Sequence, residues 1–259
     1  MKYQETAKVH KNDKIAPEHF RLTLRSPKIA KEAIPGQFVM VRCGASTDPL
    51  LRRPISFNRI NKKKGTIDLL FRVIGKGTKM LAGLEAGSEI DLVGPLGNGF
   101  EEFAVKKNAV LIGGGAGIAP LLALAESIIS KDVKAYALIG GNNKVNVLTK
   151  KDFADLGCKV LVSTDDGSAG KKGRVTDLLL DLLKGLSLYS TQVFACGPRP
   201  MIKTLTEIAA QFKVPVQVSL EEWMACGIGA CFGCTVKTRK GNKKVCSDGP
   251  VFNIEDIAW

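Results

Sequence analysis

Four of the seven cysteines lie close together near the end of the 259-residue chain, with the spacing C-x4-C-x2-C-x11-C at Cys226, Cys231, Cys234 and Cys246. The N-terminal stretch "MKYQETAKVHKNDKIA" has no apolar core of a secretory signal, so we expect a cytoplasmic protein. Structural disulfides are rare in that reducing compartment, where a tight group of thiols indicates metal binding or redox chemistry. Residues 219–259 could hardly form a core alone, so we predict a small domain stapled by a metal centre.

The spacing of the four thiols narrows the kind of centre. Zinc sites favour cysteine pairs in two separate knuckles, whereas here three cysteines share one loop and the fourth follows later. This is the spacing of a plant-type [2Fe–2S] cluster. Gly227, Gly229 and Gly233 fit that interpretation, because glycines let the backbone wrap closely around an inorganic core and aim N–H groups at sulfur. A structural zinc site and a redox-active dithiol are the alternatives.

Residues 1–103 are expected to form an antiparallel β-barrel. Short apolar runs such as "FRLTLRSP" and "GQFVMVRCG" are separated by Gly, Pro and Asn turn signals, and apolar and polar residues alternate over residues 66–73. Closely spaced strands of this kind predict a barrel rather than helices. The dense turn cluster "GPLGNGF" at 94–100 places the domain boundary shortly after it.

Residues 104–218 change to alternating strands and helices, which predicts a doubly wound parallel sheet with helices on both faces. The uncharged stretch from Asn108 to Ala125 contains three consecutive glycines and a proline. A membrane-spanning helix is therefore not expected there, and we predict a buried strand, a tight loop and the start of a buried helix. The fold class expected is a multidomain α/β plus β protein.

The chain carries a formal net charge of +13. Nucleic-acid binding would show basic residues interleaved with aromatics or a known reading motif, and neither is present. The charge therefore indicates either a solvated basic surface or a docking site for an acidic protein. The interval 235–245, "TVKTRKGNKKV", is expected to form a hairpin around Gly241-Asn242, and both interpretations stay open for it.

One motif at the end of a predicted barrel strand points to a flavin. Arg53-Pro54-Ile55-Ser56 resembles the R-x-Y-[ST] motif of the ferredoxin-reductase family of flavoproteins. The resemblance implies that Arg53 pairs with the FAD pyrophosphate, for which a guanidinium has a suitable geometry, and that Ser56 lies near the ring or ribityl chain. Ile55 replaces an aromatic residue of the family, so the flavin face must be covered differently.

Two further segments support the flavin motif. The segment "GKGT" at 75–78 is expected to offer the backbone of Gly77 and the hydroxyl of Thr78 to the same pyrophosphate, with a helix beginning at Thr78. The strand Leu70-Phe71-Arg72 resembles the family strand that passes the isoalloxazine ring. The ordered combination of the three segments is more specific than any one of them.

Two glycine-containing turns are similar to the nicotinamide motifs of the same family. "GGGAGIAPL" resembles the loop G-[GT]-G-x-G-[IV]-[AT]-P, and "CGPRPMI" resembles C-G-P-x-x-M. Pro120 suits the first turn of a helix. The cofactor-binding residues implied are Gly113, Gly114, Gly115, Gly117, Pro120, Cys196, Gly197 and Pro198.

Cys196 is the one candidate for a role in catalysis. A buried core thiol is the alternative interpretation of Cys196 and the default one for Cys43 and Cys158. Asp165 and Asp166 follow a predicted strand where the adenosine half should lie, and their charges disfavour a 2′-phosphate. We therefore expect NADH rather than NADPH.

The order of barrel, nicotinamide domain and C-terminal [2Fe–2S] segment resembles the family of electron-transfer subunits of type-B dihydroorotate dehydrogenases. The resemblance implies an oxidoreductase of pyrimidine biosynthesis in which electrons pass between NAD(H), FAD and the cluster. It also implies a partner subunit with FMN that oxidises dihydroorotate to orotate, in a heterotetramer of two plus two. The alternatives are a related subunit serving ferredoxin or a sulfur compound, and a non-enzymatic redox sensor.

Overall fold

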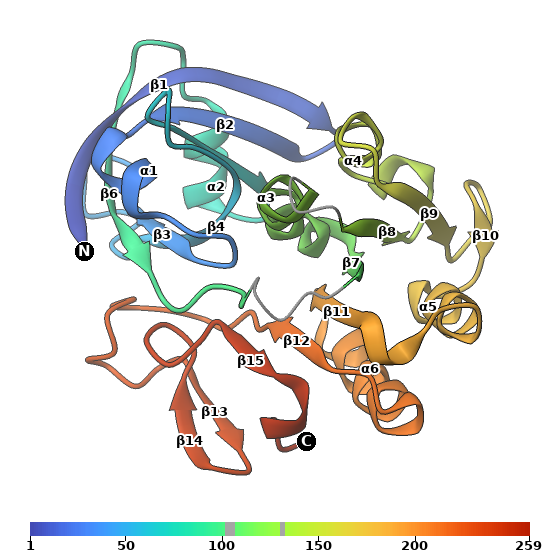
Figure 1. The fold of residues 1–259 in the computed structure, drawn as a ribbon. Helices are drawn as coiled ribbons and strands as arrows, with labels where there is room; N and C mark the ends of the chain where they lie inside the picture. Colours follow the sequence, from blue (N-terminus) through green and yellow to red (C-terminus); the bar gives the residue numbers. More distant parts are fainter. Residues whose placement is uncertain (102–106, 130–132) are drawn as a thin grey trace.

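The computed structural model describes residues 1–101, 107–129 and 133–259. Figure 1 shows an N-terminal barrel, a wound sheet beside it and a C-terminal hairpin that lies below the barrel. The predicted boundary between residues 103 and 104 lies outside the described residues.

Among the described residues, the N-terminal part forms a closed antiparallel barrel with the strand order β1-β2-β5-β4-β3-β6. The strands are β1 (Tyr3–Ala16), β2 (His19–Arg25), β3 (Phe38–Val41), β4 (Arg53–Asn61), β5 (Thr66–Arg72) and β6 (Glu89–Leu96). Two short helices, α1 (Pro27–Glu32) and α2 (Lys76–Ala82), accompany them. The barrel prediction is confirmed.

The consecutive apolar residues of β5 show how the barrel meets the next domain. Leu69 and Phe71 point into the barrel core, as alternation along a strand requires. Leu70 points the other way and packs in the core of the second domain. β5 is therefore buried on both faces, which explains why its pattern ends in a continuous apolar run.

The second part is a seven-stranded sheet with the order β10-β9-β8-β7-β11-β12-β15. Its strands are β7 (Asn108–Gly114), β8 (Lys134–Gly141), β9 (Lys159–Thr164), β10 (Lys171–Lys172), β11 (Thr191–Cys196), β12 (Val216–Ser219) and β15 (Val251–Asn253). Residues from α3 (Ala119–Ile128) and α4 (Lys150–Asp155) join one core, and residues from α5 (Val175–Lys184) and α6 (Arg199–Phe212) join the core on the other face. The doubly wound prediction is confirmed.

The uncharged stretch also folds as expected: β7 leads into the 3-10 turn η2 (Gly115–Ile118) and then into buried α3. Further 3-10 turns are η4 (Lys144–Asn146), η5 (Leu188–Ser190) and η6 (Ile254–Asp256). In the described part of the chain, no helix is long and apolar enough to cross a membrane.

The C-terminal segment packs against both the barrel and the wound sheet. Its last strand, β15, pairs antiparallel with β12 and so extends the otherwise parallel sheet. Cys234 and Cys246 share a core cluster with Phe38 and Met40 of the barrel. A segment with few apolar residues gains its buried surface in this way from its neighbours.

The predicted hairpin forms from β13 (Thr235–Thr238) and β14 (Gly241–Lys244), but its turn is Arg239-Lys240, two residues before the expected position. The Thr238 hydroxyl donates to the Gly241 carbonyl (2.6 Å) and accepts from the Lys240 N–H (3.2 Å). Gly241 has φ +93°, a conformation that glycine adopts without steric cost. Gly241 thus closes the turn and begins the second strand.

An ion network joins the barrel to the wound sheet. Asp152 of α4 forms salt bridges with Arg21 (2.7 Å) and Arg59 (2.8 Å) of two barrel strands. Arg59 also forms a salt bridge with Glu126 of α3 (2.7 Å). Burial would raise the pKa of Asp152, but the two guanidinium groups outweigh it and lower that pKa. Burial raises the pKa of Glu126 in spite of Arg59. These half-buried pairs fix how the barrel sits against α3 and α4.

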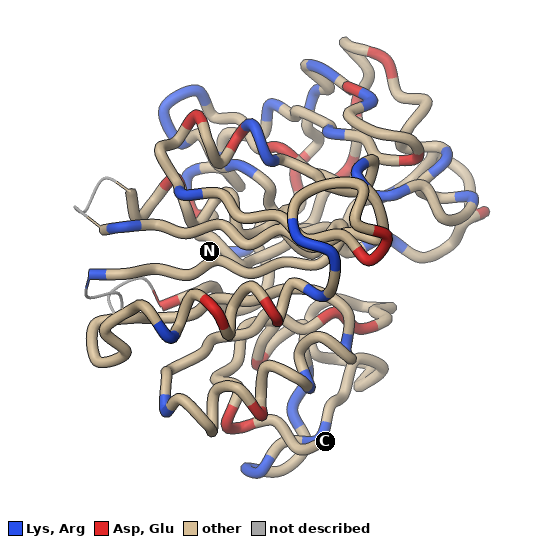
Figure 2. The backbone as a smooth tube through the Cα atoms, turned by 90° about the vertical axis from the view of Figure 1, so that its right-hand side faces the viewer, with Lys and Arg blue, Asp and Glu red and all other residues tan. Residues whose placement is uncertain are grey.

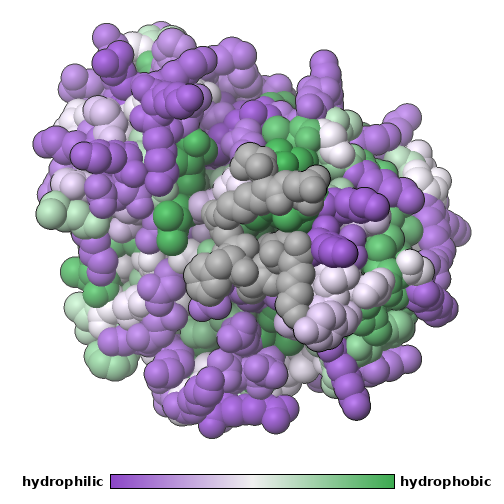
Figure 3. All heavy atoms as spheres, in the orientation of Figure 1, coloured by the Kyte–Doolittle hydropathy of each residue, from purple (hydrophilic) through white to green (hydrophobic). Residues whose placement is uncertain are grey.

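The basic residues are spread over the molecule. Figure 2 shows Lys and Arg on both halves, interrupted by Asp and Glu, and Figure 3 shows hydrophilic side chains over much of the face seen there. In Figure 2 the Lys and Arg positions along the backbone are not gathered into one large field. This distribution fits a solvated basic surface better than a single electrostatic docking face.

Candidate functional site

The first residue of the predicted flavin motif lies beside the segment 75–78. A Cβ added to Gly77 would lie 3.1 Å from Nε of Arg53 and 3.0 Å from Sγ of buried Cys43. The glycine therefore allows the Arg53 guanidinium to approach this loop closely. Arg53 donates to the Leu51 carbonyl (2.6 Å), and no carboxylate of the described residues pairs with it. Its charge remains available for an anion.

The neighbouring arginine has a different environment. Arg52 forms a two-pronged contact with Asp91, with Nη1–Oδ1 and Nη2–Oδ2 distances of 3.1 and 2.8 Å. Burial would raise the pKa of Asp91, but hydrogen bonds from Arg52 and Gln4 outweigh that effect and lower it. Arg52 is thus committed to the barrel. The tertiary structure separates two adjacent arginines that look alike in the sequence.

Thr78 is in place, but the expected helix start there is wrong. Helix α2 begins at Lys76, and Thr78 lies in its first turn. The Thr78 hydroxyl accepts N–H groups of Ile74 (3.0 Å) and Gly75 (3.2 Å) and donates to the Gly75 carbonyl (3.1 Å). These bonds satisfy backbone groups ahead of the helix, so the helix can begin two residues earlier.

The other flavin-motif residues divide between the barrel core and its surface. Ile55 is buried in the barrel core, so its side chain does not cover a ring outside the barrel. Pro54 and Ser56 are half-buried. Phe71 stacks with Phe20 at 6.1 Å between ring centroids.

Arg72 is exposed and pairs with Glu18 at 2.9 Å. The structure therefore brings Arg53, Gly77 and Thr78 together, while Phe71 lies in the barrel core and Arg72 is paired at the surface.

The two predicted nicotinamide turns pack directly on each other. A Cβ on Gly117 would lie 2.5 Å from the Cys196 carbonyl oxygen and 2.6 Å from Cα of Gly197. A Cβ on Gly114 would lie 3.2 Å from both Pro198 Cδ and Met201 Sδ. Gly117 is thus required by the close approach between the ends of the neighbouring parallel strands β7 and β11, and Gly114 leaves little room for a side chain there.

The remaining residues of the glycine loop have distinct places. Gly113 packs tightly on the backbone of Ile118, where a Cβ would lie 2.5 Å from Cα. Gly115 has φ +56° and faces open space, and Pro120 lies in the first turn of α3. The side-chain amide of buried Asn58 donates to the Ala119 carbonyl (2.8 Å), which ties the barrel to this helix start.

The third expected site for the dinucleotide lies at the end of β9. Asp165 and Asp166 follow that strand, and their N–H groups donate to the carbonyls of Gly141 and Asn142 at the end of β8. Hydrogen bonds from Ser168 lower the pKa of exposed Asp166. Both residues thus stand at the carboxyl edge of the parallel sheet, where ligands of such folds bind.

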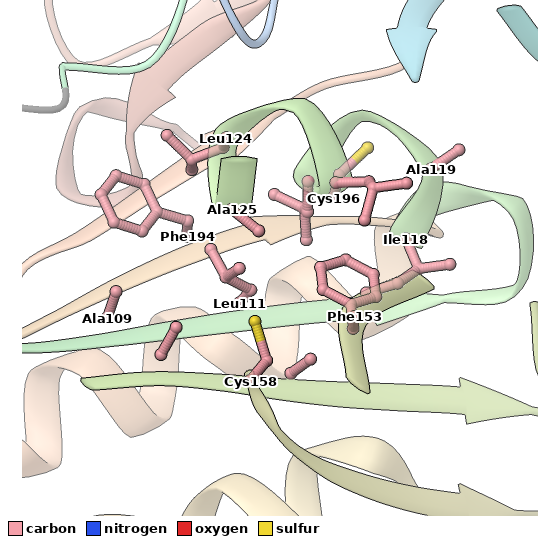
Figure 4. Packing of buried hydrophobic residues seen from close by; sticks show 14 of the residues in the cluster. Ala109, Leu111, Ile118, Ala119, Leu124, Ala125, Phe153, Cys158, Phe194 and Cys196 are labelled. Atoms are coloured by element: carbon pink, nitrogen blue, oxygen red, sulfur yellow. The ribbon is translucent and has the colours of Figure 1, made fainter. Parts of the chain in front are cut away.

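Cys196 ends β11 and is buried in the core cluster that also contains Ile118 and Ala119 (Figure 4). Its thiol donates to Glu221 Oε1 at 3.9 Å. Burial raises the pKa of Cys196 well above its usual value, and the negative charge of Glu221 adds to this. Cys43 and Cys158 are ordinary buried core thiols, as expected.

Glu221 was missed in the sequence. Burial raises its pKa, although the bond from Cys196 opposes the shift. The register pairs Cys196 with Ser219 across β11 and β12, so the residue two positions beyond Ser219 emerges at the same sheet edge. An acidic residue just after a buried parallel strand was the available signal.

The four clustered thiols form two pairs. The Cys231 N–H donates to Sγ of Cys226 (3.4 Å), and the Cys246 N–H donates to Sγ of Cys234 (3.4 Å). The Gly229 N–H donates to Sγ of Cys246 (3.1 Å). In the described part of the chain, no group of three or more Cys, His, Asp or Glu residues is arranged around a single metal ion. Two pairs of thiols suit the two irons of a [2Fe–2S] cluster better than one zinc ion.

The electrostatics of the loop differ between the pairs. Burial would raise the pKa of Cys226, but N–H groups of Ile228, Cys231 and Ala230 outweigh it and lower the pKa to about 6. Burial and the adjacent Cys234 thiol raise the pKa of Cys246 to about 12. The first pair therefore offers a ready thiolate, whereas the second needs iron to displace its protons.

One further atom fits a bound cluster. The hydroxyl oxygen of Ser247 is buried and has no hydrogen-bond partner among the described residues. It would lie 3.1 Å from a Cβ on Gly229, whose N–H bonds Cys246. Buried polar groups are normally hydrogen-bonded. An unpaired hydroxyl in this place is therefore consistent with a bound cluster, whose sulfur atoms would accept its hydrogen bond.

Three family models match successive parts of the chain. Residues 6–100 match the oxidoreductase FAD-binding domain, residues 111–207 the oxidoreductase NAD-binding domain, and residues 221–258 the iron–sulfur cluster binding domain of dihydroorotate dehydrogenase B. The chain is therefore a flavin- and NAD-binding oxidoreductase with a C-terminal iron–sulfur domain. The predictions of FAD, NAD(H) and a [2Fe–2S] cluster are confirmed at this level.

Curated relatives are similar over almost their whole length. "Dihydroorotate dehydrogenase B (NAD(+)), electron transfer subunit" of Geobacillus kaustophilus is 42% identical, with 94% of each chain covered. The protein of the same name from Desulforamulus reducens is 38% identical, with 95% of this chain and 94% of the relative covered. The chain belongs to the family of electron transfer subunits of dihydroorotate dehydrogenase B.

Solved structures agree with this fold. The structure of an NADH-dependent reduced ferredoxin–NADP oxidoreductase, described for flavin-based electron bifurcation, matches with a TM-score of 0.87 and 34% identity, covering 98% of this chain and 90% of that one. A ferredoxin reductase of carbazole 1,9a-dioxygenase matches with a TM-score of 0.72 and 19% identity, covering 84% and 69%. The latter likeness supports the fold alone.

We expect Gly117→Ala to slow reduction of the flavin by NADH about ten- to a hundredfold, because its Cβ forces apart the two nicotinamide turns and small misplacements of reacting groups are costly. Rapid mixing of NADH with the loaded protein measures this rate. Gly185→Ala is the matched control, since its nearest neighbour would be the Leu182 carbonyl at 3.7 Å. Equal rates in both variants would contradict a nicotinamide site between the turns.

Proposed function

We propose that this chain is the subunit that passes electrons between NAD(H), FAD and a [2Fe–2S] cluster on behalf of a catalytic subunit with FMN, in which dihydroorotate is oxidised to orotate. When bound, FAD exchanges a hydride with the nicotinamide and exchanges single electrons with the cluster. The names of the curated relatives support a catalytic partner of this kind. A two-plus-two heterotetramer in the cytoplasm, using NADH rather than NADPH, is the finer form of the proposal.

One observation carries the proposal furthest. The thiol loop packs on the barrel strand next to the flavin motif: a Cβ on Gly227 would lie 2.4 Å from Cγ of Met40. Met40 pairs with Pro54, and Val41 pairs with Arg53, across β3 and β4. Segments far apart in the sequence thus meet where a flavin held by Arg53 and a cluster held by the thiols would be neighbours. Such proximity is what electron transfer between them requires.

The proposed units are residues 1–103 for FAD, 104–218 for NAD(H) and 219–259 for the cluster. Arg53 would neutralise the pyrophosphate, and the turns at 113–121 and 196–201 would seat the nicotinamide. The buried Cys196 thiol would lie at the end of β11 beside that seat, where it donates to Glu221. The proposed ligands of the cluster are Cys226, Cys231, Cys234 and Cys246.

The composition of the purified protein tests the first half of the proposal. We expect about one FAD, two irons and two acid-labile sulfides per chain, as the thiol spacing of a [2Fe–2S] site requires. The measurements are the flavin absorbance released on denaturation and quantitative iron, zinc and sulfide analysis. Zinc in place of iron would contradict the cluster, and absence of flavin would contradict the role of the barrel.

The partner tests the second half. Capture of the tagged chain from native extract should retrieve an FMN protein, and the pair should reduce NAD⁺ with dihydroorotate. A pair that reduces ferredoxin instead would support the alternative function. If the capture retrieves no FMN protein and the pair shows no dihydroorotate activity, the proposed partner is overturned, while the cofactor assignments are untouched.

A further inference from the structure

A lysine of the C-terminal hairpin holds the thiol loop from outside. Lys244 ends β14, and its Nζ donates to the carbonyl of Gly229, in the middle of the loop, at 3.2 Å. The backbone of Lys244 is itself fixed: its N–H donates to Asp248 Oδ2 (2.7 Å), and its carbonyl accepts the N–H groups of Ser247 and Asp248. The half-buried ammonium therefore occupies one defined place, only two residues before Cys246.

The bond from Lys244 reaches a residue that also contacts a thiol. The N–H of Gly229 donates to Sγ of Cys246 (3.1 Å), while its carbonyl accepts from Lys244 (3.2 Å). Lys244 therefore fixes one side of a loop residue whose other side bonds a proposed cluster ligand. The Lys244 charge is held close to the thiol loop by this shared residue.

A second residue of the loop takes part in the same contact. Phe232 lies between Cys231 and Cys234, and its ring centroid is 4.7 Å from Lys244 Nζ. Phe232 has φ +60°, which is uncommon for a residue with a side chain, and its ring is exposed. A large exposed apolar ring in a strained backbone needs a reason, and attraction between the ammonium and the ring face provides one.

We propose that Lys244 is a positioning residue for the iron–sulfur centre: clamped between the Gly229 carbonyl and the Phe232 ring, its fixed positive charge stabilises the reduced cluster and holds the thiol loop in its ligating shape. The inference rests on the proposed [2Fe–2S] site. One added electron makes the centre more negative, so a nearby fixed cation favours the reduced form. Lys244 thereby sets how readily the centre accepts an electron.

The test is a redox titration of the loaded protein, read from the electron paramagnetic resonance signal of the reduced cluster. In Lys244→Met, the ratio of reduced to oxidised cluster at a fixed ambient potential should fall about tenfold, which is about 59 mV for one electron. Lys244→Arg should stay close to the parent. Lys243→Met is the matched control, because Lys243 carries the same charge but lines a groove beside Asp248 and Asp256. Its ratio should change much less.

Cluster retention provides the second readout. Phe232→Leu and Lys244→Met should both lose visible cluster absorbance to a chelator severalfold faster than the parent. The rate of loss in the double variant should be less than the product of the two single effects, since both substitutions remove the same contact. If Lys244→Met folds but binds no cluster, the test rests on Lys244→Arg, which keeps the positive charge and should therefore keep the cluster. Loss of the cluster in Lys244→Arg as well would overturn the role of the charge.

Equal shifts in Lys243→Met and Lys244→Met would also overturn the proposal, since only surface charge would then matter. An unchanged ratio in Lys244→Met would do so directly. A parent protein that binds no iron would instead overturn the proposed function, so the two failures are distinguishable.

Discussion

Replacing Cys231 by Ser is expected to abolish NAD-dependent oxidation of dihydroorotate by the reconstituted pair while NADH still reduces the flavin. Cys231 is the exposed member of the first thiol pair, and its loss leaves one iron with an incomplete set of thiolates. Coupled turnover should fall by more than about a hundredfold, because even changes around metal ligands typically cost 10–100-fold. Turnover with a small dye that accepts electrons from the flavin should persist.

The measurement compares three rates on the same preparation: flavin reduction by NADH, dye reduction, and coupled turnover with the partner. The barrel and the wound sheet have separate cores, so they should remain folded without the cluster. Cys158→Ser is the matched control, since Cys158 is a buried core thiol far along the chain from the loop. A flavin-loaded Cys231→Ser protein that lacks its cluster but retains full coupled turnover would show that electrons take another path.

Arg53→Ala is expected to weaken FAD binding by about ten- to more than a hundredfold, since a charge-assisted bond to phosphate contributes roughly 1.5–3 kcal/mol. The guanidinium has no carboxylate partner among the described residues and lies against Gly77, so its removal takes away the unpaired positive charge beside the segment 75–78. The released flavin measured on dilution gives the affinity.

The matched control is the arginine next to it. Arg52→Ala removes the same charge but breaks the contact with Asp91, so it should lower the stability of the barrel and leave FAD affinity largely unchanged. Arg53→Lys should recover only part of the binding, because an ammonium cannot make the two parallel bonds of a guanidinium to phosphate. If Arg52→Ala releases FAD as readily as Arg53→Ala, the flavin motif has been assigned to the wrong arginine.

The sequence was sufficient for the features that local pattern encodes. Alternating apolar residues and turn signals identified the barrel, and alternating strands and helices identified the parallel sheet. The thiol spacing and glycines indicated the cluster, because ligand spacing and backbone freedom are local properties. The hairpin turn and the start of α2 each lie two residues from the position predicted by local pattern. Hydrogen bonds between the hydroxyl groups of Thr238 and Thr78 and nearby backbone groups fix these two positions, and local pattern does not contain them.

Only the tertiary structure decided which residues meet across long stretches of chain. It set Glu221 against Cys196, gave β15 to the central sheet and joined the barrel to α4 through Asp152. It also assigned Arg52 to Asp91 and left Arg53 for an anion, and it placed Lys244 over Phe232. These contacts depend on which strand ends at which edge of a sheet and on which side chains fit there. Sequence spacing carries the period of a strand or helix, but it does not contain the distance between two elements that fold onto each other.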